Sequence, residues 1–119
     1  MSTIGATPKK NFGVHRGAPA PIRIRLRGGG VLVSFDNSLK FTVTHPTGSF
    51  TLGVGTGITL SAAEAVSNAE ATIQLSVAQS RQLPLGALST YEIQRTAGGQ
   101  EQVFLMGKLI AEGGGNPDD

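Results

Sequence analysis

The chain has 119 residues and a mass of 12.3 kDa, so it has room for one domain with a single hydrophobic core. The absence of cysteine excludes a disulfide framework and a thiolate metal site. Only 15% of the residues are charged, the formal net charge is +2 and glycine occurs 17 times, a composition that favours many turns and short strands over disorder.

Residues 1–21 form the first predicted element, an extended N-terminal arm. Prolines at positions 8, 19 and 21 interrupt this stretch, and proline restricts both its own backbone and that of the preceding residue. Only Ile4, Phe12 and Val14 could bury a large side chain here. We therefore expect the arm to lie outside the core, either mobile or extended along a partner.

The charge distribution singles out the same end of the chain. No acidic residue precedes Asp36, so residues 1–35 carry +6, whereas residues 36–119 carry −4 from four basic and eight acidic side chains. Such asymmetry predicts contact with an acidic partner, either nucleic acid or a protein surface. The alternative is a solvated face that binds nothing. The basic residues concerned are Lys9, Lys10, Arg16, Arg23, Arg25 and Arg27.

The first predicted strand covers residues 22–27, where apolar and basic residues alternate. Successive side chains of a strand point to opposite faces, so three apolar residues would face the core and three arginines would line the other face. Like charges in a row repel one another. They could be neutralised within the domain by Glu92 or Glu101, or by the carboxylates of a partner chain.

Further short strands are predicted to follow, with turn residues between them. The segment 62–70 contains helix-forming residues without an apolar stripe, so we expect a loop or one helical turn. A helical turn is predicted for 78–83, stopped by Pro84 and Gly86. The expected strands span 31–35, 39–44, 49–54, 57–61, 71–77, 89–95 and 102–111.

Seven or eight short strands at a spacing of roughly ten residues predict an all-β fold, a small antiparallel β-sandwich of immunoglobulin-like type. The expected organisation is the arm at 1–21, the sandwich at 22–112 and a flexible polar tail at 113–119. So small a core is marginally stable by itself, which favours a homo-oligomer or another neighbour.

The residues that could carry catalysis or bind a metal show no recognisable pattern. The acidic residues are scattered, and His15 and His45 lack the companions of a zinc site, so we expect both histidines in turns or on the surface. The glycine-rich segment 53–57 is not followed by a helix, so it predicts a tight turn and not a phosphate loop. The sequence therefore predicts no enzyme, no metal and no cofactor.

The second half of the chain resembles a family of small β-sandwich modules in tailed bacteriophages, found in the attachment domains of upper baseplate proteins and in head-fibre and tail-appendage proteins. The residues that carry this resemblance are Ile73-x-Leu75-x-Val77, Leu83-Pro84-x-Gly86, Tyr91-x-Ile93, Gly98-Gly99 and Gly107-x-Leu109. The resemblance covers residues 14–113. It departs from the family pattern at the glycine triplet 28–30, where the family has an Asp-Leu-x-Gly turn, and in the alanine-rich segment 62–70.

The resemblance implies a structural role in a virion, as a tail or baseplate adaptor for fibres, made in the bacterial host cytoplasm. A capsid decoration or cement protein is the alternative, and a small module that binds nucleic acid or carbohydrate is a further one. The partners would be other virion proteins, and we expect neither a membrane nor a nucleic acid. The candidate partner-binding residues are Lys9, Lys10, Phe12, Arg16, Arg23, Arg25 and Arg27.

Overall fold

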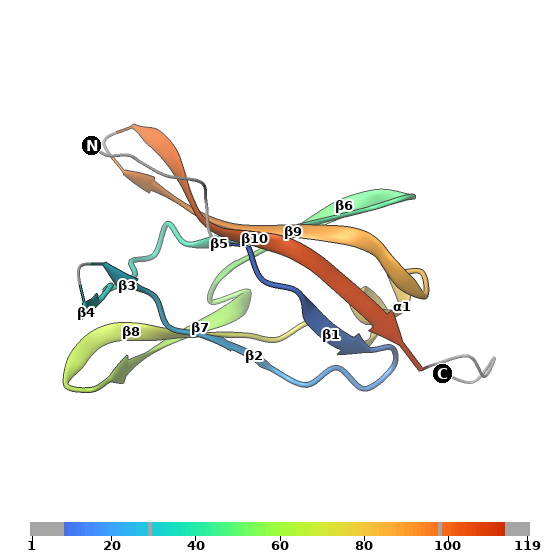
Figure 1. Cartoon of the computed structure of the whole chain (residues 1–119), viewed down its shortest axis with the longest axis horizontal. Helices are drawn as coiled ribbons and strands as arrows, with labels where there is room; N and C mark the ends of the chain where they lie inside the picture. Colours follow the sequence, from blue (N-terminus) through green and yellow to red (C-terminus); the bar gives the residue numbers. More distant parts are fainter. Residues whose placement is uncertain (1–8, 29, 98, 114–119) are drawn as a thin grey trace.

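The computed structural model describes residues 9–28, 30–97 and 99–113, without the side chains of residues 27, 97 and 101. The remainder of the predicted arm and of the predicted tail lies outside the described residues. Ten strands and one short helix follow one another in the described part of the chain (Figure 1): β1 (Phe12–His15), β2 (Ile22–Ile24), β3 (Arg27–Gly28), β4 (Val31–Leu32), β5 (Lys40–His45), β6 (Gly48–Val54), β7 (Gly57–Ala63), β8 (Val66–Ile73), α1 (Val77–Gln82), β9 (Gly86–Ala97) and β10 (Gln100–Glu112).

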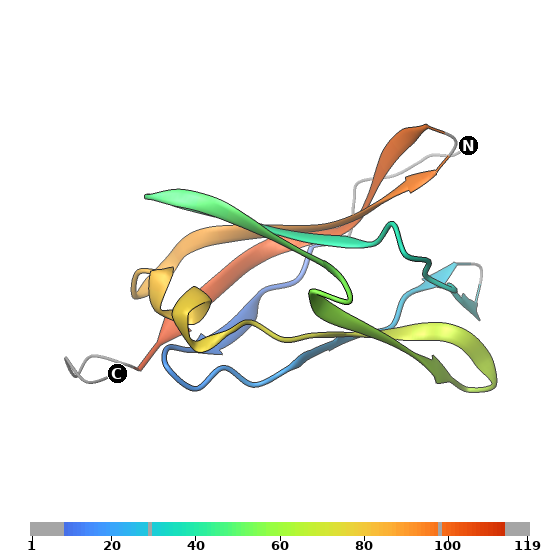
Figure 2. The same ribbon diagram turned by 180° about the vertical axis from the view of Figure 1, so that it is seen from behind.

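Eight of these strands form one mostly antiparallel sheet in the order β1-β10-β9-β5-β6-β7-β8-β2. The sheet folds over itself, so that β5, β6, β9 and β10 face β2, β7 and β8 across the core (Figures 1 and 2). The described chain is elongated, with extents of 47 × 27 × 24 Å. The predicted all-β class and small antiparallel β-sandwich are confirmed, in a form that is nearly a barrel.

The chain passes from one layer to the other at a tight corner between β6 and β7. These two strands run parallel over only two residue pairs, Gly53 with Gly57 and Val54 with Ile58. Gly55 and Gly57 have φ angles of 89° and 111°, a region of the backbone that favours glycine. The prediction of a tight turn at residues 53–57 is confirmed.

The core is built by the apolar residues of alternating strand positions. Tyr91 lies at its centre, 1% exposed, with its ring stacked on that of Phe41 at 5.3 Å between centroids. Ile22 and Ile24 are buried while Arg23 between them is exposed, as the alternation predicts. The predicted strand at 22–27 is nevertheless too long, because β2 ends at Ile24 and Arg27 belongs to a separate two-stranded sheet with β4.

The predicted boundary between arm and sandwich is wrong for the described part of the arm. Phe12–His15 form β1, which pairs in parallel with β10 and buries Val14. Two apolar residues at alternate positions are enough to hold this strand on the sheet, because β10 offers a free edge and the Tyr91 ring offers a surface for Phe12 at 5.5 Å. The sheet therefore begins at Phe12 and not at residue 22.

Two further predictions are corrected by the structure. Residues 62–70 are neither a loop nor a helical turn, because they complete the β7–β8 hairpin around a tight turn at Glu64 and Ala65. His45 is buried, with only 8% of its surface exposed, and not a surface residue as expected. Its ring on β5 packs against the ring of Phe50 on β6. The predicted helical turn is confirmed as α1, which begins with a capping box formed by Ser76 and Gln79.

Candidate functional site

The segment from Lys9 to Phe12 crosses the sheet at a place where several predicted site residues meet. The backbone N–H of Lys10 donates a hydrogen bond to the Met106 carbonyl at 2.9 Å. The Tyr91 hydroxyl donates a hydrogen bond of 2.6 Å to the Lys10 carbonyl from the core side. Burial raises the pKa of Tyr91 to about 12. These contacts fix the backbone of the segment on the edge of β10.

Gly107 makes this crossing possible. A Cβ atom at this position would lie 2.0 Å from the Lys10 carbonyl oxygen, far closer than non-bonded atoms approach one another. The missing side chain lets the carbonyl come close to β10 and lets the Tyr91 ring reach it. The position of Lys10 and Phe12 therefore depends on a residue near the other end of the chain.

A groove lies between the two ends of the curled sheet, and we call this groove the seam. Strands β1 and β2 are the first and last of the eight in the sheet order, and no backbone hydrogen bond joins them within the described residues. The seam has a volume of about 390 Å³. It is lined by Lys10, Phe12, Arg23, Ile24, Arg25, Leu26, Glu70 and Leu105.

The charges of the seam are predominantly positive. Arg25 forms ion pairs with Glu70 at 3.3 Å and with Glu64 at 3.7 Å. The side chains of Arg25 and Glu64 are exposed and that of Glu70 is half-buried, and ion pairs near the surface are worth about 1 kcal/mol or less each. Arg23 is exposed and makes no ion pair with any described residue. The Lys10 ammonium lies 5.4 Å from the centroid of the Phe12 ring. Two cationic groups thus remain available at the rim to a bound anion.

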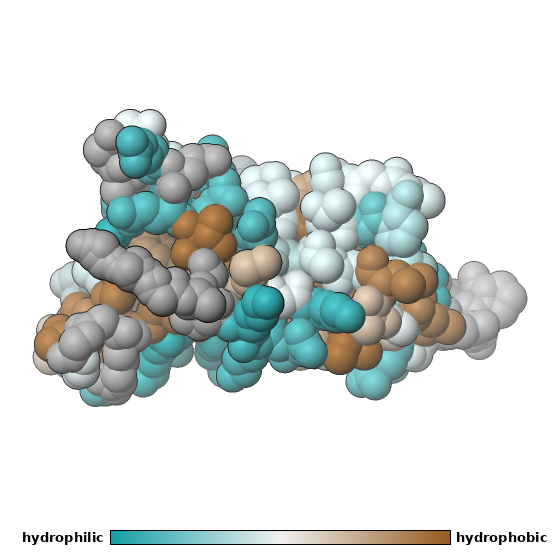
Figure 3. All heavy atoms as spheres, turned by 45° about the horizontal axis from the view of Figure 1, so that its top comes forward, coloured by the Kyte–Doolittle hydropathy of each residue, from teal (hydrophilic) through white to brown (hydrophobic). Residues whose placement is uncertain are grey.

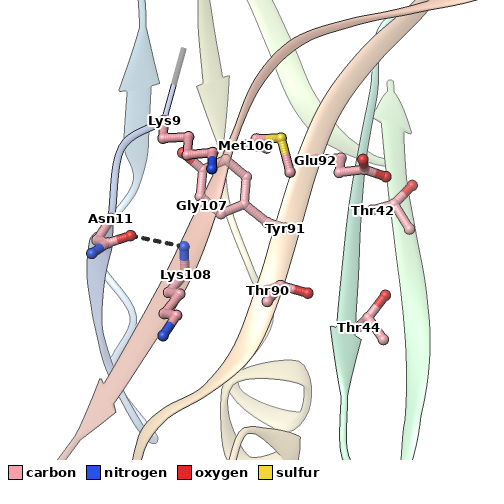
Figure 4. Close-up of a pocket in the computed structure, with 10 residues that line it drawn as sticks. All are labelled: Lys9, Asn11, Thr42, Thr44, Thr90, Tyr91, Glu92, Met106, Gly107 and Lys108. Atoms are coloured by element: carbon pink, nitrogen blue, oxygen red, sulfur yellow. Dashed lines mark hydrogen bonds between the residues drawn. The ribbon is translucent and has the colours of Figure 1, made fainter. Parts of the chain in front are cut away.

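A second groove lies on the outer face of β5, β9 and β10, and we call it the outer groove (Figure 4). Its volume is about 340 Å³. Figure 4 shows the side chains of Thr42, Thr44, Thr90 and Glu92 along β5 and β9, across from Lys9 and Lys108. The Asn11 side-chain oxygen accepts a hydrogen bond from the backbone N–H of Lys108 at 3.0 Å. This groove offers hydroxyl groups and charges of both signs.

The structure brings together four of the seven candidate residues in the seam, namely Lys10, Phe12, Arg23 and Arg25. Lys9 lies beside them but lines the outer groove. Arg16 lies away from the seam, where it donates a hydrogen bond to the Arg81 carbonyl at the end of α1. Arg27 lies on β3, and its side chain is outside the described residues.

The intramolecular carboxylates beside the arginines differ from those expected. Glu64 and Glu70 pair with Arg25, whereas Glu92 lines the outer groove and the Glu101 side chain is not described. Arg23 lies opposite Thr72 in the register of β2 and β8, and the same register continued by two residues places Glu70 opposite Arg25. The sequence contains the charges, but only the strand order shows which of them meet.

Exposed apolar side chains gather at another place, over the end of the molecule where β9 begins and β10 ends (Figure 3). The residues are Leu85, Leu88 and Ile110, of which Leu88 is 63% exposed. Ile110 is the neighbour of Leu109, which lies opposite Ser89. A cluster of exposed large apolar residues is a common feature of contact surfaces.

No protein family and no curated protein matches the chain. Among the described residues, no group of three or more histidine or acidic side chains is placed so that it could hold a metal ion. No helix in the described part of the chain is long and apolar enough to cross a membrane.

Proposed function

We propose that this chain is a non-enzymatic structural protein of a bacteriophage particle that docks on neighbouring virion subunits through its basic N-terminal segment and β2. The observation that carries the proposal is the meeting of Lys10, Arg23 and Arg25 at the seam, beside two free strand edges. Free strand edges and the exposed cations Lys10 and Arg23 at the rim fit a protein partner that presents carboxylates.

The phage setting is supported by the resemblance of residues 14–113 to small β-sandwich modules of tailed bacteriophages. Within a particle we place the protein in the tail or baseplate, as an adaptor that carries fibres, with several copies arranged around the tail. It would be made in the host cytoplasm and incorporated into the particle with other virion proteins. The exposed patch of Leu85, Leu88 and Ile110 would provide a second contact surface, away from the seam.

A capsid decoration protein is the second placement of the same docking function. A small elongated module with two separate contact surfaces would also fit a joint between capsid subunits. A module for nucleic acid is less well supported, because such modules stack bases on exposed aromatic side chains. All six aromatic residues of this chain are buried or half-buried.

The test is quantitative mass spectrometry of purified particles of the source phage, with the copy number scaled to the major capsid protein. We expect a few to a few dozen copies per particle, as a tail or baseplate adaptor requires. A ratio near one copy per capsid subunit or capsomer would favour the decoration protein. Absence from purified particles would contradict the proposed function.

The docking surface is tested in the same particles with charge reversals. We expect R23E to reduce incorporation at least about tenfold, because it replaces an attraction to partner carboxylates by a repulsion. The matched control is K108E, which makes the same change of charge in the outer groove. Equal incorporation of the two variants would show that the seam is not the docking surface.

A further inference from the structure

The seam is the place where the curled sheet remains incomplete. Each inner strand of the sheet pairs on both sides, but β1 pairs only with β10, and β2 pairs only with β8. Their remaining edges face the seam with backbone N–H and C=O groups that no described strand uses. Such an edge is a template for an added strand.

The side chains around the seam alternate in chemistry as an added strand would require. Ile24 and Leu105 are buried at its inner side, with Phe12 and Leu26 half-buried next to them. Lys10 and Arg23 are exposed at its rim. A strand in this position would turn every second side chain towards the apolar residues and the others towards the two cations.

We propose that the seam accepts an extended acidic segment of a partner protein, which adds a strand to the free edge of β2. The segment alternates apolar and acidic residues: the apolar side chains cover Phe12 and Leu26, and the carboxylates bind Arg23 and Lys10. This inference rests on the proposed docking function and names the chemistry of the partner. In this arrangement the sheet of this chain receives a strand, whereas the sequence alone leaves the arm either mobile or extended along a partner.

The free strand edges of the seam favour a peptide over the other occupants. Strand addition needs backbone N–H donors, which the backbone of a nucleic acid lacks. A second copy of this chain offers no matching segment, because none of its stretches alternates apolar and acidic residues over more than one acidic position. A different protein with such a segment therefore fits best.

The experiment uses the full chain and a fluorescent synthetic peptide of alternating valine and glutamate, with binding measured by fluorescence anisotropy. We expect R23E to weaken binding of this peptide at least about tenfold, and K108E to leave it within about twofold. We expect R23E to bind the counterpart peptide with lysine in place of glutamate better than the unmodified chain does. Circular dichroism and thermal unfolding of both variants check that each is folded.

Backbone pairing is tested with two N-methylated forms of the glutamate peptide, methylated at alternate residues in the two possible phases. Strand addition predicts that one form loses at least about tenfold in affinity while the other binds well, because only one set of N–H groups faces β2. Equal binding of both forms, tighter binding of an oligonucleotide than of the peptide, or no binding of the glutamate peptide would overturn the proposal. If the peptide binds as expected but the protein is absent from particles, the proposed function fails and the seam proposal holds.

Discussion

At the scale of single residues, the position of the N-terminal segment depends on the absence of a side chain at Gly107. The alternation of β10 correctly indicates that Gly107 shares the inner face with Leu105 and Leu109. It does not indicate that a backbone carbonyl occupies the space of the missing Cβ. That information comes from the pairing of β1 with β10, which joins residues about one hundred positions apart.

We predict that Gly107→Ala lowers the free energy of unfolding by about 1–3 kcal/mol, the usual range for an overpacked site. The new methyl group would push the Lys10 carbonyl away from β10 and separate it from the Tyr91 hydroxyl. Urea unfolding measures the change.

The control for this substitution is Gly13→Ala on β1. A Cβ there would have its nearest neighbour, the Glu112 side chain, at 4.0 Å, so we expect a change within about 1 kcal/mol. Equal effects of the two substitutions would mean that the close approach at Gly107 does not hold the segment in place.

At the scale of elements, the β7–β8 hairpin shows why residues 62–70 were not predicted to form strands. Residues 62–70 contain alanine and glutamate, which favour helices, and the hairpin lacks the usual Asn-Gly or Asp-Gly turn. The turn is instead made by Glu64 and Ala65 with φ angles of 50° and 64°. Pairing of β7 with β8 therefore overrides both the helix propensity of these residues and the preference of such a turn for asparagine, aspartate and glycine.

We predict that Ala65→Gly raises the free energy of unfolding by about 0.5–1 kcal/mol. A left-handed backbone costs an L-residue about 1–2 kcal/mol, and relief of this cost exceeds the extra chain entropy that glycine brings, about 0.4–1 kcal/mol. Urea unfolding of the variant and of the unmodified chain, under the same conditions, gives the difference.

Ala71→Gly is the matched substitution in a regular part of the same hairpin. Ala71 is 1% exposed and pairs with Leu60 and Ile24, so glycine there should lower stability by at least about 0.5–1 kcal/mol. A loss of stability in Ala65→Gly similar to that in Ala71→Gly would show that the turn stores no strain.

At the scale of the whole molecule, the sequence predicts the class of fold but not the order of the strands in the sheet. Alternation in residues 22–24, 39–44 and 71–73 was enough to predict strands and buried faces, because a strand with one buried face needs only local pattern. The strand predicted for 71–77 is too long, since β8 ends at Ile73 and Val77 is an exposed residue that begins α1. The strand order depends on contacts between distant segments, so the seam could not be foreseen. Four of its residues were nevertheless expected to bind a partner, because the basic charge is concentrated near the start of the chain.

The hydrogen bond between Tyr91 and Lys10 joins residues that are 81 positions apart in the sequence. The dependence of stability on pH tests whether this bond holds the start of the chain against the sheet. The pKa of Tyr91 is about 12 in the folded chain because the phenol is buried, against 10.0 ordinarily. Since the unfolded chain loses this proton more readily, the contribution of the neutral phenol to stability is complete below pH 10 and falls as the pH rises towards 12. Tyr91→Phe should abolish this fall, at a cost near neutral pH of about 1 kcal/mol for the lost hydrogen bond.

Two measurements test whether the Tyr91 hydroxyl is buried and bonded to Lys10. The chain has one tyrosine and no tryptophan, so the near-ultraviolet absorbance of tyrosinate reports Tyr91 alone, and urea unfolding between pH 9 and pH 12 reports stability. We expect absorbance to rise only near pH 12, and the difference in stability between the unmodified chain and Tyr91→Phe to shrink above pH 10. Titration near the ordinary value, with a difference that does not depend on pH, would mean that the Tyr91 hydroxyl reaches solvent and that the start of the chain is not held against β10.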